Sequence, residues 1–179
     1  MGGKVGVKSK TGAGSTFTVE LEFGRCEEIP QIPQRRAKAS SDPSIGKLTG
    51  RSILLVDDSD LVIDLTEWLF NNAAAKVCSC KNGLEALNWL SENDTPDIIL
   101  MDVQMPVMDG NTAVSILRQN PRFKNVPVIA MTAGATKSNI EDAMNAGSTD
   151  YITKPFDPDD LIEMVLKYLP TCELAHSQT

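Results

Sequence analysis

The 179-residue sequence is poor in long apolar runs, in histidine and in aromatic side chains. Its longest apolar runs have the length of a strand, well short of the roughly 18–20 residues that a membrane-spanning helix needs. The amino-terminal stretch lacks the basic and apolar pattern of a signal peptide. These absences predict a cytoplasmic chain without a membrane segment. The ordinary balance of apolar and charged residues predicts globular domains.

Motifs that would bind a metal through cysteine and histidine are also absent. The four cysteines are Cys26, Cys78, Cys80 and Cys172, and the single histidine is His176. Cys78 and Cys80 form a C-x-C pair, not the C-x-x-C spacing of zinc and redox sites. We therefore expect four free thiols in a reducing compartment. His176 lies in a short polar stretch, so we expect a solvated residue and not the phosphorylated histidine of a kinase.

Basic charge is scarce over most of the chain. Residues 1–49 carry a net charge of +3, whereas residues 50–179 carry a net charge of −10. A nucleic-acid surface needs clustered Lys and Arg, so the larger segment is not predicted to bind nucleic acid. Its acidity is compatible with a cation site made of carboxylates.

Composition divides the chain into four segments. Residues 1–24 hold two short strand patterns, and residues 25–50 are rich in Pro, Gln and Ser, which predicts a linker. Residues 51–170 hold the main domain, and residues 171–179 form a polar tail.

The first segment predicts a β-hairpin around the glycine-rich stretch KTGAGS. In its second strand apolar and polar residues alternate, which predicts a half-buried strand. An isolated hairpin is marginal in water, so we expect it to dock on another element or to be the remnant of a larger domain. The alternating apolar residues are Phe17, Val19, Leu21 and Phe23.

The main domain alternates strands with helices. The strand patterns are SILLV, AKVCSC, DIILMD, VPVIAMT and STDYITK. Continuous apolar strands are typical of a parallel sheet covered on both faces, and right-handed crossovers then give a doubly wound α/β fold. A helix is also expected near residues 138–145. Apolar residues at helical spacing mark the other helices: Leu61, Leu65, Trp68 and Leu69; Leu84, Leu87 and Leu90; Ala113, Val114, Ile116 and Leu117; Leu161, Ile162, Val165, Leu166 and Leu169.

Polar side chains close four of the five predicted strands. The first strand ends on Asp57 and Asp58, the third on Asp102, the fourth on Thr132 and the fifth on Lys154. The carboxyl ends of parallel strands form the ligand-binding edge of such a sheet, so we expect these side chains to converge. Each has an ordinary explanation alone, such as a helix cap, a turn residue or a solvated lysine. Four together predict a site.

The residue types at this edge suit phosphoryl chemistry. Three neighbouring carboxylates repel one another, and a divalent cation removes that cost. Oxygen ligands together with a phosphate oxygen favour Mg²⁺. Lys154 and Thr132 supply a cation and a hydroxyl that can stabilise a phosphoryl group. One of the carboxylates can then act as a nucleophile and become an aspartyl phosphate.

Four stretches carry a specific family resemblance: ILLVDDSDLV, PDIILMDVQMPVMDG, VPVIAMTAGA and DYITKPFDPDDL. Through them residues 51–170 resemble the two-component receiver domain, the phosphoacceptor module of response regulators and hybrid kinases. The resemblance implies a flavodoxin-like sheet of order 2-1-3-4-5 and phosphorylation of Asp102. It also implies Mg²⁺ held by Asp57 and Asp58, with Asp58 the preferred direct ligand, beside Asp102 and the backbone carbonyl of Gln104.

The same resemblance implies further roles around the phosphoryl group. Thr132 and Lys154 would contact it, and Tyr151 would be an aromatic switch that turns inward when Thr132 shifts. A receiver would also catalyse its own phosphorylation and dephosphorylation. The residues that would shape the surrounding loops are Pro106, Gly110 and Pro155, the last through a cis bond to Lys154.

Residues 1–24 are similar to the last hairpin of a histidine-kinase ATP-binding domain. We therefore interpret the chain as the C-terminal part of a hybrid histidine kinase. Its expected partners are a histidine kinase domain, a histidine phosphotransfer protein, or both. The exposed edges of the hairpin also make a homodimer an arrangement to test.

Other functions remain open at this point. A phosphohydrolase of the haloacid dehalogenase type shares the nucleophilic aspartate, but it needs a second aspartate where this chain has Gln104. A receiver fold used only for binding is a second alternative. Kinase activity of this chain itself is not predicted, because its single histidine, His176, lies in the short polar tail. The stretch GAGST is also no phosphate-binding loop, because it lacks the spacing and the lysine.

Overall fold

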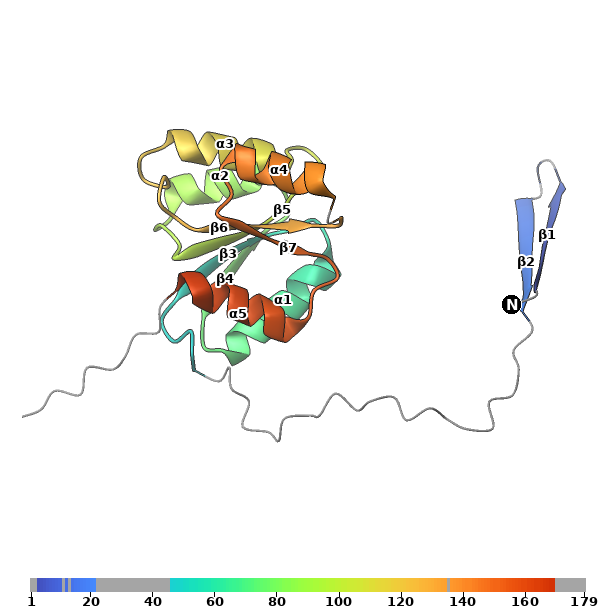
Figure 1. Ribbon diagram of the computed structural model, residues 1–179, viewed down its shortest axis with the longest axis horizontal. Coiled ribbons are helices and arrows are strands. Elements are labelled where there is room, and N and C mark those ends of the chain that lie inside the picture. The colour runs from blue at the N-terminus through green and yellow to red at the C-terminus, as the bar shows by residue number, and fades with distance from the viewer. Residues whose placement is uncertain (1–2, 11, 13, 22–45, 135, 170–179) are drawn as a thin grey trace, which may run out of the picture. The chain divides into compact units, whose positions relative to one another are not determined.

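The computed structural model of the protein divides into two units, residues 1–41 and residues 42–179, each of which is described by itself (Figure 1). The predicted tail, most of the predicted linker, His176, Cys26 and Cys172 lie outside the described residues. The structure describes residues 3–10, 12, 14–21, 46–134 and 136–169.

The first unit contains the predicted hairpin. β1 (Gly3–Lys10) pairs antiparallel with β2 (Gly14–Leu21), and Gly12 at the turn has a φ of 78°, a conformation that glycine adopts readily. Val5 lies opposite Val19, and Val7 lies opposite Phe17. Phe17 and Val19 were expected to be half-buried, but in this unit all four side chains are exposed, Phe17 at 74%. Phe23 lies outside the described residues.

The second unit is built on five parallel strands. Their order in the sheet is β4-β3-β5-β6-β7, which is the predicted 2-1-3-4-5 order when the strands are counted within this unit. The predicted doubly wound α/β fold is thus confirmed. The strands are β3 (Ser52–Val56), β4 (Lys76–Cys80), β5 (Ile98–Asp102), β6 (Val128–Thr132) and β7 (Asp150–Thr153).

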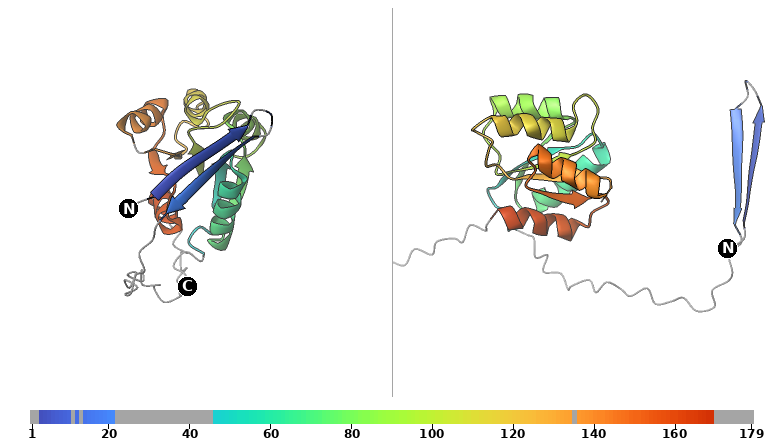
Figure 2. Two further views of the ribbon diagram at one scale, coloured as in Figure 1. Left: turned by 90° about the vertical axis from the view of Figure 1, so that its right-hand side faces the viewer. Right: turned by 45° about the horizontal axis from the view of Figure 1, so that its top comes forward.

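Five helices cover the sheet. α1 and α5 lie on one face, and α2, α3 and α4 lie on the other (Figures 1 and 2). In the part of the chain that the structure describes, no helix is long and apolar enough to cross a membrane. The helices are α1 (Asp60–Asn72), α2 (Gly83–Glu92), α3 (Gly110–Gln119), α4 (Lys137–Ala146) and α5 (Pro158–Tyr168).

Side chains that accept hydrogen bonds from free backbone N–H groups begin several of these helices. Asn82 accepts from the N–H of Glu85, whose own carboxylate accepts from the N–H of Lys81, a reciprocal cap. Asp109 caps α3 by accepting from the N–H of Thr112. These caps fix where the helices start, and therefore where the loops at the carboxyl edge of the sheet end.

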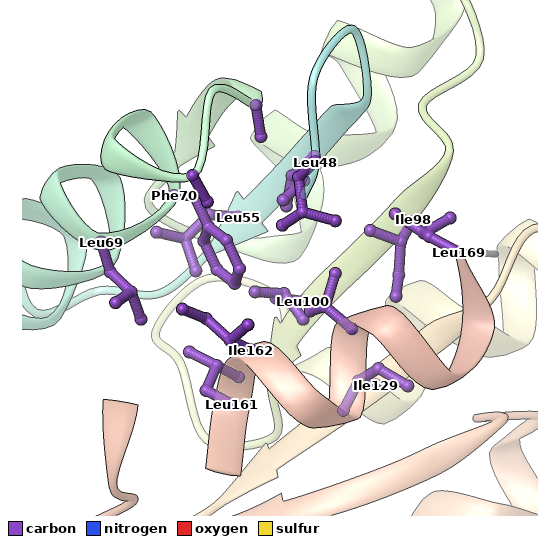
Figure 3. Packing of buried hydrophobic residues seen from close by; sticks show 14 of the residues in the cluster. Leu48, Leu55, Leu69, Phe70, Ile98, Leu100, Ile129, Leu161, Ile162 and Leu169 are labelled. Carbon is purple, nitrogen blue, oxygen red and sulfur yellow. The ribbon is translucent and has the colours of Figure 1, made fainter. Parts of the chain in front are cut away.

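The core beneath α1 and α5 includes a residue that composition had assigned to the linker. Leu48 is fully buried in this cluster, and its N–H donates to the carbonyl of Ala73 at 3.1 Å. Figure 3 shows it near Phe70 and Leu55. The packed unit therefore begins before residue 51, because Leu48 is a buried member of the cluster formed with α1 and α5.

On the opposite face of the sheet, the three helices differ in how many side chains they bury. α2 and α3 contribute a cluster that includes Leu90, Ala113 and Leu117, whereas α4 buries only Ala143 among the residues described. Several residues that marked helices by their spacing do not face the core. On α1, Leu61, Leu65 and Trp68 are exposed, and the buried stripe runs through Ile63, Thr66, Leu69 and Phe70. Leu84 and Ile116 are likewise exposed.

Candidate functional site

The parallel register brings the ends of four strands together. Asp102 at the end of β5 pairs with Met131, and Thr132 at the end of β6 pairs with Thr153. Asp57 directly follows β3, and β3 lies beside β5 on the side opposite β6. The residues that closed four predicted strands therefore lie at one edge of the sheet.

Lys154 is the central cation of this edge. Its N–H donates to the carbonyl of Thr132 at 2.7 Å, which continues the strand ladder by one residue. Its ammonium group donates to Asp57 Oδ2 at 2.5 Å and to Asp102 Oδ2 at 2.8 Å. The peptide bond from Lys154 to Pro155 is cis, as the family resemblance implied. One ammonium group thus joins two buried carboxylates from different strands.

Three carboxylates form the acidic part of the site. Asp57, Asp58 and Asp102 each offer an oxygen, and these oxygens lie within 4.8 Å of one another. Asp57 is fully buried and Asp102 is 6% exposed, whereas Asp58 is exposed. Oxygen donors at this separation fit a hard divalent cation, and the exposed Asp58 leaves the cluster open to solvent. The donor set therefore suits Mg²⁺ better than a metal that prefers nitrogen or sulfur.

The electrostatics of Asp102 reflect its burial. Desolvation raises the pKa of this carboxyl above its ordinary value, and the negative charge of Asp57 adds to the increase. Hydrogen bonds from Lys154 and from the N–H of Gln104, at 3.1 Å, oppose that effect. Burial by itself would lower the pKa of Lys154, but its bonds to the two carboxylates raise it. Lys154 is therefore charged at neutral pH.

The loop after Asp102 folds back onto it closely. The N–H of Gly110 donates to the carbonyl of Val103 at 3.1 Å. A Cβ atom at Gly110 would lie 2.1 Å from the backbone oxygen of Asp102, so the start of α3 can approach β5 only through a glycine. Gly83, at the start of α2, is similarly tight against Met108. Gly110 was singled out from the sequence, whereas Gly83 was not, since nothing near it in sequence signals a contact with the loop.

The remaining candidate residues lie on β6 and β7. Thr132 is 4% exposed, and its hydroxyl donates to the carbonyl of Gly134 at 3.1 Å. Asn139 on α4 donates to the same carbonyl at 3.4 Å, a contact that the sequence did not indicate. Tyr151 is half-buried on β7, opposite Ala130 on β6. Pro106 is exposed in the loop that follows Asp102.

Fold and site together define a flavodoxin-like α/β domain with a carboxylate site at the carboxyl edge of its sheet. The sequence profile of the response regulator receiver domain family matches residues 53–166, which is more than half of the chain. The chain belongs to this family.

Individual relatives agree with this assignment. The chain is 34% identical over 119 residues to the polar-differentiation response regulator DivK of Brucella anthropi, covering 66% of this chain and 96% of DivK. It is also 34% identical over 119 residues to the signal transduction histidine-protein kinase BarA of Escherichia coli, covering 66% of this chain but only 13% of BarA. Its likeness to such kinases is thus limited to a small part of their length.

Solved structures resemble the second unit as well. One is the receiver domain of a sensor histidine kinase from Pseudomonas aeruginosa, which has a magnesium ion coordinated in its active-site cleft. It is 31% identical, with a TM-score of 0.63, over 68% of this chain and 98% of that one. The protein therefore contains a two-component receiver domain.

Proposed function

We propose that Asp102 accepts a phosphoryl group from a phosphohistidine in a Mg²⁺-dependent reaction. The observation that carries this proposal is the placement of Asp102, buried beside Asp57 and bonded to Lys154 at 2.8 Å. A carboxylate oxygen of Asp102 forms a bond to phosphorus as the phosphorus–nitrogen bond breaks. The electron pair of that bond returns to the imidazole of the donor, and no further oxidant or cofactor is needed.

The carboxylate cluster would hold the metal. Asp58 is the exposed member and the direct ligand in this proposal, with Asp57, Asp102 and the backbone carbonyl of Gln104 around the same position. When bound, Mg²⁺ supplies Lewis-acid stabilisation of the phosphoryl oxygens. Lys154 can turn from Asp102 to the phosphoryl group, and Thr132 can donate its hydroxyl to another oxygen.

Phosphorylation would then alter the edge of the sheet near α4. In this proposal Thr132 leaves the carbonyl of Gly134 to bind the phosphoryl group, and Tyr151 moves into the space released. The change is a population shift between two states that differ in their contacts to Thr132. It would carry the signal from Asp102 to the surface around α4, β7 and α5.

The same reasoning extends to the partners and to the rest of the chain. We infer that residues 1–24 are the end of a kinase ATP-binding domain, that residues 25–50 link it to the receiver, and that the chain is part of a cytoplasmic hybrid kinase. Likeness over 119 residues to BarA, a histidine-protein kinase, supports the part of this inference that assigns the receiver to a hybrid kinase. The phosphodonor would be a histidine kinase domain or a histidine phosphotransfer protein.

Two alternatives are distinguishable from this proposal. Gln104, two residues after Asp102, offers no carboxylate to act as the general acid of a haloacid dehalogenase-like phosphatase. A receiver that serves only for binding would keep the fold without accepting phosphate. The residues that line this edge favour phosphorylation over both.

Intact mass after incubation with acetyl phosphate and Mg²⁺ tests the proposal. We expect a gain of one phosphoryl group that is absent in Asp102→Asn and in the presence of EDTA. An unmodified wild-type protein would leave the binding-only alternative. Rapid hydrolysis of many phosphomonoesters, with no stable adduct, would favour the phosphatase.

A further inference from the structure

The loop between β5 and α3 has a strained turn at its tip. The N–H of Met108 donates to the carbonyl of Pro106 at 2.8 Å, which closes a three-residue γ-turn centred on Val107. Val107 has a φ of 69°, the rare and strained form of this turn. A β-branched residue is especially unfavourable in this conformation. Glycine or asparagine would form the same turn with less strain.

The comparison with Ala74 shows what is unusual about Val107. In the described parts of the chain, two residues other than glycine have a positive φ: Ala74 and Val107. Ala74 has a φ of 63° and follows the C-cap of α1, where the left-handed conformation commonly ends a helix. Its side chain is also small. Val107 ends no helix, so the ordinary reason for a positive φ does not apply to it.

Neighbouring contacts hold the strained turn in place. The carbonyl of Met108 accepts from the N–H of Gly83 at 3.0 Å, and the carbonyl of Val103 accepts from the N–H of Gly110. Met105 and Met108, which flank the tip, pack against the buried cluster beneath α2 and α3. Hydrogen bonds therefore hold both ends of the loop, and the two methionines anchor its tip to the buried cluster. The surrounding structure can thus maintain the strained conformation.

Packing of the Val107 side chain in the core does not offset this strain. Val107 is 80% exposed, the highest value among the large apolar side chains that the structure describes. The loop begins directly after Asp102, and Gly110 closes it against the Asp102 backbone. Val107 thus stands at the same edge of the sheet as the phosphoacceptor, on a rigid support. A surface that delivers a phosphoryl group to Asp102 must come to this edge.

We propose that Val107 is a specificity-determining contact for the protein that donates the phosphoryl group. It would fill an apolar recess beside the phosphohistidine of that donor. Asp58 and Asp109 are exposed on the loops at the same edge, so the donor surface around the recess would carry Lys or Arg. This inference rests on the proposed function, and it assigns Val107 to recognition of the donor and not to the chemical step.

Paired donors separate recognition from chemistry. Acetyl phosphate reaches Asp102 without a protein surface, whereas a phosphorylated protein must dock. The protein donor is chosen by testing purified histidine kinases and phosphotransfer proteins from the source organism and keeping the fastest. Val107→Asn removes the apolar contact but tolerates the positive φ, and Val107→Ile keeps the contact. Ala74→Asn is the matched control at the other positive φ.

We expect Val107→Asn to slow transfer from the protein donor by roughly tenfold or more. Labelling by acetyl phosphate should stay within about twofold, and Val107→Ile and Ala74→Asn should resemble the wild type with both donors. Unchanged transfer from the protein donor in Val107→Asn would overturn the assignment. Equal losses with both donors would also overturn it, because Val107 would then act through the geometry of the site.

Two results with the wild type separate this inference from the proposed function. Labelling by acetyl phosphate but by no protein donor would refute a docking role for Val107 and leave Asp102 as a phosphoacceptor. An absence of labelling by acetyl phosphate would refute the proposed function itself.

Discussion

The ammonium group of Lys154 lies 2.8 Å from a carboxylate oxygen of Asp102, the proposed phosphoacceptor, and also bonds to Asp57. One cation thus balances two buried carboxylates, and the third carboxylate, Asp58, adds further negative charge. Without a divalent cation the site carries an excess of negative charge, and two of its three carboxylates, Asp57 and Asp102, are buried. Its chemistry and its effect on stability are therefore linked.

Replacing Asp102 with Asn should stabilise the protein when no metal is present. Burial raises the pKa of the Asp102 carboxyl, so its ionised form is less favourable in the folded than in the unfolded state. A group of this kind supports stability at low pH and loses that support as pH rises through its raised pKa. We expect Asp102→Asn to raise Tm by roughly 2–4 °C at pH 7 in EDTA, and by less near pH 4.

Thermal melts of Asp102→Asn, of the wild type and of Asp94→Asn would check this. Asp94 is exposed in the loop before β5, so its replacement should leave Tm nearly unchanged. A lower Tm for Asp102→Asn at pH 7 would show that the bond to Lys154 outweighs the cost of burial.

Replacing Lys154 with Met should have the opposite effect. It leaves the buried carboxylates of Asp57 and Asp102 without their cation, and breaking such a pair costs about 3–5 kcal/mol. The pKa of Lys154 is raised, so its contribution is complete below the ordinary lysine value of 10.5 and is lost only as pH rises through the raised value. Urea unfolding at pH 7 measures the loss, with the exposed Lys124→Met as control. Equal unfolding midpoints for the two variants would contradict the central role of Lys154.

Adding Mg²⁺ should stabilise the wild type through the carboxylate cluster. A ligand at 100 times its dissociation constant adds about 2.7 kcal/mol to the free energy of unfolding. We expect Tm to rise with MgCl₂ in the wild type and to respond weakly in Asp58→Asn, which lacks the exposed ligand. Asp64→Asn, an exposed carboxylate on α1, should respond like the wild type. An equal response in all three proteins would place the metal elsewhere.

A methyl group at Gly110 should disturb both stability and phosphorylation. Its Cβ would lie 2.1 Å from the backbone oxygen of Asp102, and neither backbone can yield without moving β5 or α3. Overpacking of this kind typically costs about 1–3 kcal/mol, and here we also expect labelling of Asp102 by acetyl phosphate to fall sharply. At Gly134 the nearest atom is the flexible end of Asn139, 3.4 Å away, so Gly134→Ala is the milder control. Similar labelling of both variants would show that the loop adapts.

The parallel sheet and the carboxylate cluster were predictable from strand-length apolar runs that end on polar residues, whereas the order of the strands came from the family resemblance. The buried side of a helix was less predictable. Leu61, Leu65 and Trp68 have helical spacing, but the side chains that meet the sheet are those of Ile63 and Phe70, and spacing alone does not choose between two apolar stripes.

Two further features escaped prediction for different reasons. Leu48 lies in a stretch with the composition of a linker, so nothing local marks it as part of the core. The γ-turn at Val107 contains no glycine, and a β-branched residue would ordinarily argue against it. It depends on a hydrogen bond from Gly83 on α2 and on the packing of Met105 and Met108, partly buried residues of the same loop, against the cluster beneath α2 and α3.

The thin packing of α4 has a consequence for the order in which the domain opens. With Ala143 as its one buried side chain among those described, α4 can separate from the sheet without exposing much apolar surface. The five residues of β5 are all buried, so their backbone can be reached by solvent only when much more of the fold is lost. In deuterated water the amide protons of α4 would exchange long before those of β5 beside Asp102. We therefore expect α4, the helix nearest in sequence to Thr132, to be the first element to unfold locally.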